Sequence, residues 1–148
     1  MQISSRFTIA LHIFACIDTF NKEHKITSDF LASSIQVNPV IIRKILSLLR
    51  NSGLITVQRG TGGTSIAKPA SEITLYDVYK AVESVSEEGL FHFHENPNLN
   101  CPVGKNIHRV LDDKLLRIQK AMEKELASIT LEEVLKDTKY YIAQSEEV

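Results

Sequence analysis

Five residues near the start of segment 38–51 have side chains suited to contacts with DNA. Arg43 and Lys44 can donate hydrogen bonds to guanine edges or to phosphates, and Ile41 can contact a thymine methyl group. Asn38 can donate to a phosphate while it caps a helix, and Val40 follows two positions later. The alternative is that Arg43 and Lys44 are ordinary solvated charges and that Val40 and Ile41 belong to the core. The order of the surrounding elements favours contact with DNA.

The glycine-rich run 59–63 offers a second basic contact. Arg59 is followed by Gly60 and Gly62, which permit positive φ and allow close approach of the backbone to a sugar-phosphate surface. An arginine carried there suits a narrow, electronegative minor groove. A nucleotide-binding loop would need a following Gly-Lys-Ser or Gly-Lys-Thr, which this run lacks. Arg6 is a further candidate for contact with the DNA backbone.

Cys101 and three histidines are the candidates for sensing or metal chemistry. Together with His92, His94 and His108, Cys101 can supply zinc ligands, although this spacing is not a standard one. Cys101 can instead be a redox-sensing thiol, because the N-terminal end of a helix lowers the pKa of a cysteine. The third interpretation is a small residue packed at a loop-to-helix junction. We expect no bound metal, and we expect Cys16 to belong to the core.

The elements that must position these residues follow from capping signals and hydrophobic spacing. Two helices are expected before residue 36, and a third over 38–51, with Asn38 as its N-cap and Gly53 as its stop. The β-branched runs 54–57 and 64–67 predict a hairpin over 54–67 with the glycine run as its tip. Thr74 predicts a fourth helix. Helix, helix, turn, helix and hairpin is the order of a winged helix-turn-helix domain, which we expect over 1–83.

The second half of the chain predicts a connection and two helices. Residues 84–104 have the composition of a connecting or sensor-like loop, 105–128 of a long amphipathic helix, and 130–143 of a last helix. A long amphipathic helix appended to a small domain needs a partner for its apolar stripe, so we expect 105–148 to mediate dimerisation. The alternative is packing within its own chain. The candidate dimerisation residues are Ile107, Val110, Leu111, Leu115, Ile118 and Met122. The expected fold is therefore mainly α, with a small β-hairpin wing.

Composition indicates a soluble protein and an uneven distribution of charge. The chain has 148 residues, of which 43% are hydrophobic, enough for one domain or a small domain with an appendage. Residues 1–70 hold eight Lys/Arg and three Asp/Glu, a net charge of +5, whereas the remaining 78 residues carry −6. This asymmetry fits a basic module that meets a polyanion and an acidic part with another role, and it equally fits solvated surface charge distributed by chance, so the order of the elements decides between the two.

Several classes of protein are excluded. No apolar stretch approaches the roughly 18 residues of a membrane span, and no signal-peptide cleavage site follows the apolar segment 9–17. Two cysteines cannot form a disulfide framework, so we expect a cytoplasmic protein without membrane contact. The chain has no nucleophile motif, paired-carboxylate spacing or metalloprotease helix, so we do not expect an enzyme.

The segment from Ile26 to Glu83 resembles the Rrf2 family of bacterial transcription regulators, and the similarity extends over most of the chain. The matching motifs are Ser4-Ser5-Arg6, Phe30-Leu31-Ala32, Ile42-Arg43-Lys44-Ile45-Leu46-Ser47-Leu48-Leu49, Ser52-Gly53-Leu54-Ile55, Arg59-Gly60-Thr61-Gly62-Gly63, Ala67-Lys68-Pro69 and Ile73-Thr74-Leu75-Tyr76-Asp77-Val78. The glycine tip followed by Lys-Pro and Ile-Thr is fairly specific.

The resemblance implies a homodimeric winged-helix protein whose long helices cross between subunits. It also implies DNA contacts by the recognition-helix residues at positions 38, 40, 41, 43 and 44 and by Arg59. Iron-sulfur members of the family carry three cysteines in the loop before the long helix, whereas this loop holds Cys101 alone. The loop resembles a cluster-free branch, and we expect no cofactor.

The sequence thus predicts a homodimeric, sequence-specific regulator of transcription. We expect a repressor that binds a palindromic operator on double-stranded DNA through helix 38–51 and the wing 54–67. One alternative is a redox- or metal-responsive regulator that senses through Cys101. Another is a regulator controlled by a protein partner that docks on the acidic half. The sequence identifies neither the operator nor a small-molecule or protein effector.

Overall fold

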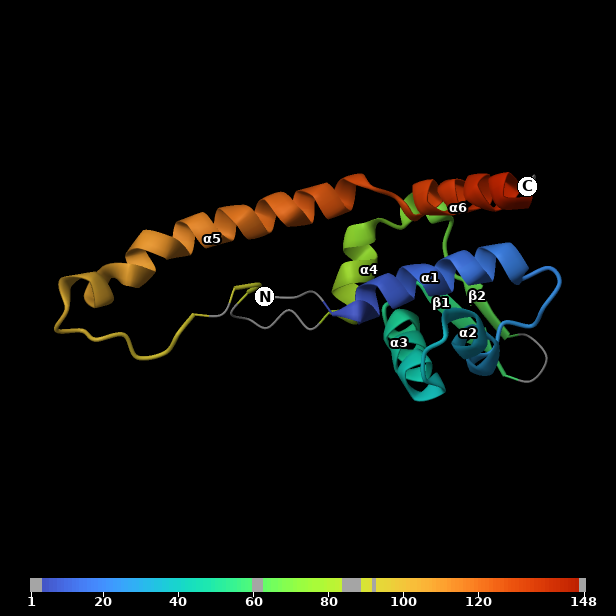
Figure 1. Cartoon of the computed structure of the whole chain (residues 1–148), viewed down its shortest axis with the longest axis horizontal. Coiled ribbons are helices and arrows are strands. Elements are labelled where there is room, and N and C mark those ends of the chain that lie inside the picture. The colour runs from blue at the N-terminus through green and yellow to red at the C-terminus, as the bar shows by residue number, and fades with distance from the viewer. Residues whose placement is uncertain (1–3, 60–62, 84–88, 92, 147–148) are drawn as a thin grey trace.

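The computed structural model describes residues 4–59, 63–83, 89–91 and 93–146. Its elements, in chain order, are α1 Ser5–Phe20, α2 Ser28–Ile35, α3 Pro39–Asn51, β1 Ile55–Gln58, β2 Gly63–Ile66, η1 Ala70–Glu72, α4 Leu75–Val82, α5 Pro102–Ser128 and α6 Leu131–Glu146. Figure 1 shows α1 to α4 gathered beside the hairpin, while α5 extends away from them and α6 returns alongside α1. The expected class, mainly α with a small hairpin wing, is confirmed.

The first three helices begin at capping residues that the sequence predicts. Ser4 caps α1, and Thr27 caps α2 by accepting a hydrogen bond from the Phe30 N–H at 3.1 Å. The side chain of Asn38 accepts from the Val40 N–H at 2.9 Å, and Pro39 occupies the first turn of α3. These local hydrogen bonds set the entry angle of α3, the expected recognition helix.

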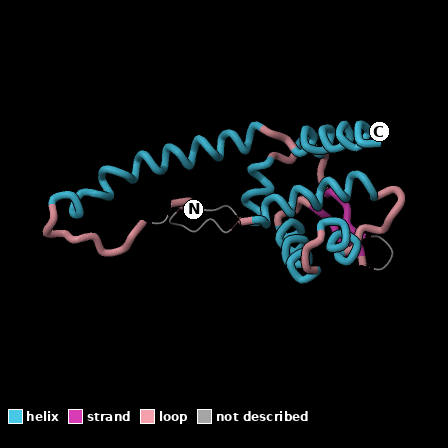
Figure 2. The backbone as a smooth tube through the Cα atoms, in the orientation of Figure 1, coloured by secondary structure: helices cyan, strands magenta, loops and turns pink. Residues whose placement is uncertain are grey.

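The two strands, magenta in Figure 2, form a short hairpin. They are antiparallel, with Ile55 opposite Ile66 and Gln58 opposite Gly63. Each strand begins or ends within one residue of the expected range. Gly63 has φ +68°, and a Cβ at this position would lie 3.1 Å from backbone atoms of Ile26. The Thr64 N–H donates to the Ile26 carbonyl at 3.0 Å. The end of the hairpin next to its tip is therefore fixed against the segment that leads into α2.

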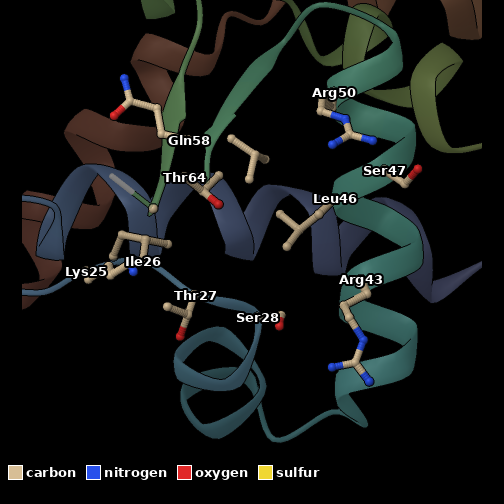
Figure 3. A pocket seen from close by; sticks show the side chains of 12 residues that line it. Lys25, Ile26, Thr27, Ser28, Arg43, Leu46, Ser47, Arg50, Gln58 and Thr64 are labelled. Atoms are coloured by element: carbon tan, nitrogen blue, oxygen red, sulfur yellow. The ribbon is translucent and has the colours of Figure 1, made fainter. Parts of the chain in front are cut away.

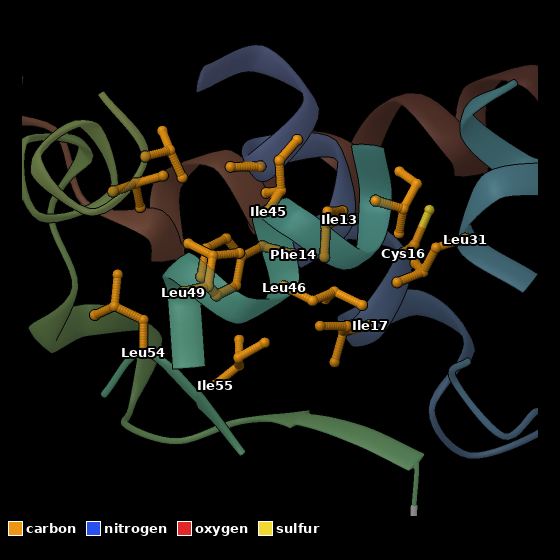
Figure 4. Close-up of a cluster of buried hydrophobic side chains, with 14 of the residues drawn as sticks. Ile13, Phe14, Cys16, Ile17, Leu31, Ile45, Leu46, Leu49, Leu54 and Ile55 are labelled. Carbon is orange, nitrogen blue, oxygen red and sulfur yellow. The ribbon is translucent and has the colours of Figure 1, made fainter. Parts of the chain in front are cut away.

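One hydrophobic core holds the helices and the hairpin together (Figure 4). Phe14, Ile45 and Ile55 are fully or almost fully buried in it, from α1, α3 and β1 respectively. Leu131 and Leu135 of α6 belong to the same core, so the last helix completes the packing of the helices and hairpin of the first half of the chain.

The long helix begins earlier than the sequence predicts. It starts at Pro102 rather than at 105, so the expected loop boundary at 104 is wrong by three residues. Proline is favoured in the first turn of a helix, because its missing N–H is not needed there. Gly104 lies in this turn at a position with no room for a side chain. An added Cβ there would lie 2.4 Å from the Asn98 carbonyl oxygen.

The junction between α5 and α6 is attached to the start of α4. The Leu75 N–H donates to the Ile129 carbonyl at 2.9 Å, and the Leu131 N–H donates to the Ile73 carbonyl at 2.7 Å. Lys139 of α6 forms an ion pair with Asp18 of α1 at 3.3 Å. The chain therefore leaves the domain along α5 and re-enters it at α6. In the described part of the chain, no helix has the length and apolar character to cross a membrane.

Candidate nucleic-acid interface

The outer face of α3 carries the side chains expected to read DNA. Val40 is 57% exposed and Ile41 is 42% exposed, so the interpretation of these two residues as core is wrong. Arg43 and Lys44 are also exposed, whereas Ile42 and Ile45 are fully buried on the opposite face. The helix thus presents two cations and two aliphatic side chains to solvent, as a helix that enters a major groove requires.

Asn38 has a structural role at the start of this face. Its side-chain oxygen is used by the cap on Val40, which leaves the amide N–H groups able to donate. Asn38 can therefore cap α3 with its side-chain oxygen and donate to a phosphate with its side-chain nitrogen.

A groove of about 370 Å³ separates α3 from the hairpin and from the start of α2 (Figure 3). Arg43, Ser47 and Arg50 line it from one side of α3, at positions i, i+4 and i+7. Thr27 and Ser28 line it from the N-terminal end of α2, and the end of the hairpin next to its tip forms the third wall. Two guanidinium groups and a helix N-terminus around one groove form a surface that attracts phosphate.

Of the charged and hydroxyl side chains named here, only that of Arg43 was predicted from the sequence as a contact. Lys25, Ser28 and Arg50 also line the groove, although Lys25 and Arg50 are 25 positions apart in the sequence. Only the excess of basic residues in the first 70 positions pointed toward them. Their meeting depends on the packing of the hairpin against Ile26, which the sequence pattern does not reveal.

The wing is described in part. Arg59 directly follows β1 and is exposed, as a wing contact requires. Gly60 and Gly62, the other two expected contacts of the wing, lie outside the described residues. The positive φ of Gly63 serves packing within the chain, where its backbone approaches Ile26, rather than approach to a ligand.

Arg6 lies in the first turn of α1 and is half-buried. Its Nε donates to Ser4 Oγ at 3.2 Å, and its backbone N–H donates to the same oxygen at 3.3 Å. The guanidinium NH₂ groups have no protein hydrogen bond among the described residues, so Arg6 retains donors for a phosphate.

The six candidate dimerisation residues divide into two sets on α5. Four of them are half-buried within the chain itself: Ile107, Leu111, Leu115 and Met122. Val110 and Ile118 are 49% and 55% exposed, and Val103, which was not predicted, is 69% exposed. These three side chains lie along one side of the helix, since they are separated by seven and eight residues.

Cys101 is the N-cap of α5 and is partly exposed. The pKa of its thiol is lowered by the nearby backbone N–H groups of Gly104 and Val103. Cys101 was expected in the loop, four residues before a helix that starts at 105, but the structure places it directly before the first residue of α5.

The described donors of the loop do not gather as an iron-sulfur or zinc site. The chain has two cysteines, and Cys16 is 4% exposed in the core beside Ser34. His94 and His108 both stack with Phe93. Among the residues that the structure describes, no three His, Cys, Asp or Glu side chains gather as metal ligands, and His92 lies outside them.

Comparisons with known proteins agree with this geometry. The Rrf2 family, described as an iron-dependent transcriptional regulator, matches residues 3–137. The HTH-type transcriptional regulator YwnA of Bacillus subtilis is 41% identical over 134 residues, which are 90% of this chain and 97% of YwnA. The solved structure of a DNA-binding protein is 36% identical with a TM-score of 0.70, and the match covers 88% of this chain and 99% of that one.

A more distant solved structure supports the fold alone. CymR, the global cysteine regulator of Bacillus subtilis, is 21% identical with a TM-score of 0.66, over 92% of this chain and 97% of CymR. With a family match over most of its length, this chain belongs to the Rrf2 family and is a DNA-binding regulator of transcription, not an enzyme.

Proposed function

We propose that the chain acts as a homodimeric repressor that binds a palindromic operator. The observation that carries the proposal is the outer face of α3, where Val40, Arg43 and Lys44 are exposed beside a groove with cationic walls. In this arrangement Arg43 and Lys44 read base edges in the major groove and Ile41 contacts a thymine methyl group. Repression follows when the occupied operator overlaps a promoter.

The groove between α3 and the hairpin holds the DNA backbone in this proposal. Arg43 and Arg50 donate to phosphate oxygens from α3, while the N-terminus of α2 adds backbone N–H groups and the hydroxyls of Thr27 and Ser28. Arg59 enters the neighbouring minor groove. Arg6 donates to a phosphate from the start of α1.

Dimerisation is proposed through the exposed side of α5. A single module makes few phosphate contacts, and the salt-dependent part of the affinity grows with their number. Val103, Val110 and Ile118 form an exposed apolar row on a helix of 27 residues, and a second copy of the same helix can cover it. Two recognition helices then meet half-sites about one DNA turn apart, roughly 34 Å.

The decisive experiment selects DNA from the source genome with the purified full-length protein. Bound fragments are sequenced and one is footprinted. The molar masses of the free protein and of its complex with DNA are measured by analytical ultracentrifugation. We expect two protected half-sites with inverted symmetry, a dimer mass, and lower expression from a reporter under that operator. A monomer that selects no sequence at low salt contradicts the proposal.

A second candidate, thiol-dependent control of DNA binding, is favoured by the position of Cys101. Its thiol lies at the N-terminal end of α5, where the nearby backbone N–H groups of Gly104 and Val103 lower its pKa and stabilise the reactive thiolate. Operator affinity of the parent and of Cys101→Ser is compared with and without hydrogen peroxide, and reversal by dithiothreitol is checked. Thiol control is supported if peroxide weakens operator binding by the parent protein but not by Cys101→Ser. Equal behaviour of both proteins contradicts it.

A further inference from the structure

Two adjoining cavities between the loop 89–96 and α5 have no part in the DNA interface. One has a volume of about 300 Å³ and the other of about 500 Å³, each within the size range of small-molecule sites. Both are lined by Phe91, Phe93 and Asp112, so together they form one continuous groove. Gly89, Leu115, Leu116 and Gln119 line one end of it, and His94, Glu95, Asn96 and His108 line the other.

The walls of the groove are aromatic and flat. The ring of Phe93 stacks on His108 with centroids 4.0 Å apart and an interplanar angle of 25°. On its other neighbour, His94, the centroids are 5.7 Å apart and the angle is 28°. The stacked faces of Phe93 and His108 cover each other, so the groove is lined by the remaining surface of these rings and by Phe91. Aromatic rings attract planar molecules and cations.

The charges that face the groove are negative. Asp112 and Glu95 are both lining residues, and no lysine or arginine lines either cavity among the described residues. Asp112 Oδ1 lies 3.5 Å from His108 Nδ1, and the carboxylate is 60% exposed, so it can still accept from a second donor. Such a groove disfavours anions.

The loop is held against α5 at both ends of the groove. Gln119 Oε1 accepts from the Leu90 N–H at 3.0 Å, while Gln119 Nε2 donates to Glu123 at 3.0 Å. At the other end, the Cys101 N–H donates to the Asn98 carbonyl at 3.1 Å. Part of the ordering needed for binding is therefore already present in the free protein.

We propose that this groove binds a planar organic cation. The ring system stacks against Phe91 and Phe93, and the positive charge pairs with the carboxylate of Asp112, with Glu95 as a second negative group. The groove lies in the segment that joins the winged domain to α5. On the function proposed above, the bound cation is the effector, although the binding site itself does not depend on that function.

The test measures binding to the protein in the absence of DNA. Proflavine, a planar tricyclic cation, is titrated with the full-length protein and followed by fluorescence anisotropy, and 9-anthracenecarboxylate serves as the anion with a ring system of similar size. We expect saturable binding of proflavine and none of the carboxylate. Absence of proflavine binding, or equal binding of both compounds, overturns the proposal.

Neighbouring aspartates provide the matched control. Asp112→Asn weakens proflavine binding about three- to fivefold, the effect of losing one exposed ion pair, whereas Asp113→Asn leaves it unchanged because Asp113 does not line the groove. Phe93→Leu also weakens binding and Phe93→Tyr retains it, with circular dichroism to check folding. Equal affinities of the two aspartate variants overturn the site. Failure of the protein to bind an operator has no bearing on this result, because the assay contains no DNA.

Discussion

Ser4 Oγ donates a hydrogen bond of 2.6 Å to Glu83 Oε1, a carboxylate 79 positions further along the chain. The same oxygen of Ser4 accepts from the backbone N–H and from Nε of Arg6. The start of α1 is thus joined to the last described residue before the loop that precedes α5. Through Ser4, a candidate DNA contact and the beginning of that loop share one hydrogen-bond network.

Removal of this link lowers stability. Ser4→Ala removes both the N-cap of α1 and the bond to the carboxylate, and Glu83→Ala removes the bond alone, so each costs about 1–2 kcal/mol of unfolding free energy. Urea denaturation of both variants and of the double variant gives the coupling energy, which we expect to be about 1 kcal/mol. Glu72→Ala, at an exposed acid without a side-chain hydrogen bond to a described residue, is the control. If the losses of unfolding free energy in the two single variants simply add in the double variant, the interaction between Ser4 and Glu83 is contradicted.

Arg43 and Arg50 line the same groove but are expected to contribute differently to DNA binding. Arg50→Ala and Arg59→Ala weaken binding to all sequences and lower the slope of log affinity against log salt by about 1 each, because each loses one backbone contact. Arg43→Ala in addition relaxes the base preference at one position of each half-site. Anisotropy titrations at several salt concentrations and with single-base operator variants separate these effects. Arg117→Ala on exposed α5 serves as the control, and parental affinity in all three variants disproves the assignment.

Dimerisation is tested with two leucine-sized residues of one helix. Ile118→Glu places a charge in the exposed apolar row of α5, so we expect monomers in sedimentation velocity and a large loss of operator affinity. Leu116, 47% exposed, lies about 200° further round the helix and lines the cation groove instead. Leu116→Glu should therefore remain dimeric. If both variants are monomeric, or if both remain dimeric, an interface on this side of α5 is contradicted.

The pKa of the Cys101 thiol is expected to be lower than that of an ordinary cysteine. The Gly104 and Val103 N–H groups favour the thiolate, which lowers the pKa of Cys101 and raises its thiolate fraction at neutral pH. The rate of alkylation by iodoacetamide, measured against pH by mass spectrometry, should thus rise with a midpoint below about 8.5, the value of a free cysteine. Unfolding in urea removes the helix and restores the ordinary midpoint. Identical midpoints in the folded and unfolded protein rule out this effect.

Gly104→Ala is expected to destabilise the start of α5. In an open helix this change is favourable by up to about 1 kcal/mol. Here the added Cβ would lie 2.4 Å from the Asn98 carbonyl oxygen, so the loop must shift, at a cost of about 1–3 kcal/mol. Amide hydrogen exchange of the first two turns of α5 should accelerate in the variant. Slower exchange there would mean that the loop yields without cost.

The DNA-binding half of the fold could be predicted closely because its signals are local. Asn38 and Pro39 mark the start of α3 and Gly53 its end, and each acts through the backbone of its own or adjacent residues. The start of α5 was missed because Pro102 and Gly104 are typical of loops. Their place inside a helix depends on a contact with Asn98, which no local pattern encodes.

The sequence by itself determined the winged helix-turn-helix order and the buried stripe of α3, since capping and hydrophobic periodicity act over a few residues. The meeting of Lys25, Ser28 and Arg50 around one groove was decided only by the tertiary structure. The same holds for the division of the α5 stripe into half-buried Leu111 and exposed Ile118. Both depend on how separate elements pack, because packing brings together side chains that are far apart along the chain and covers one side of a helix rather than another.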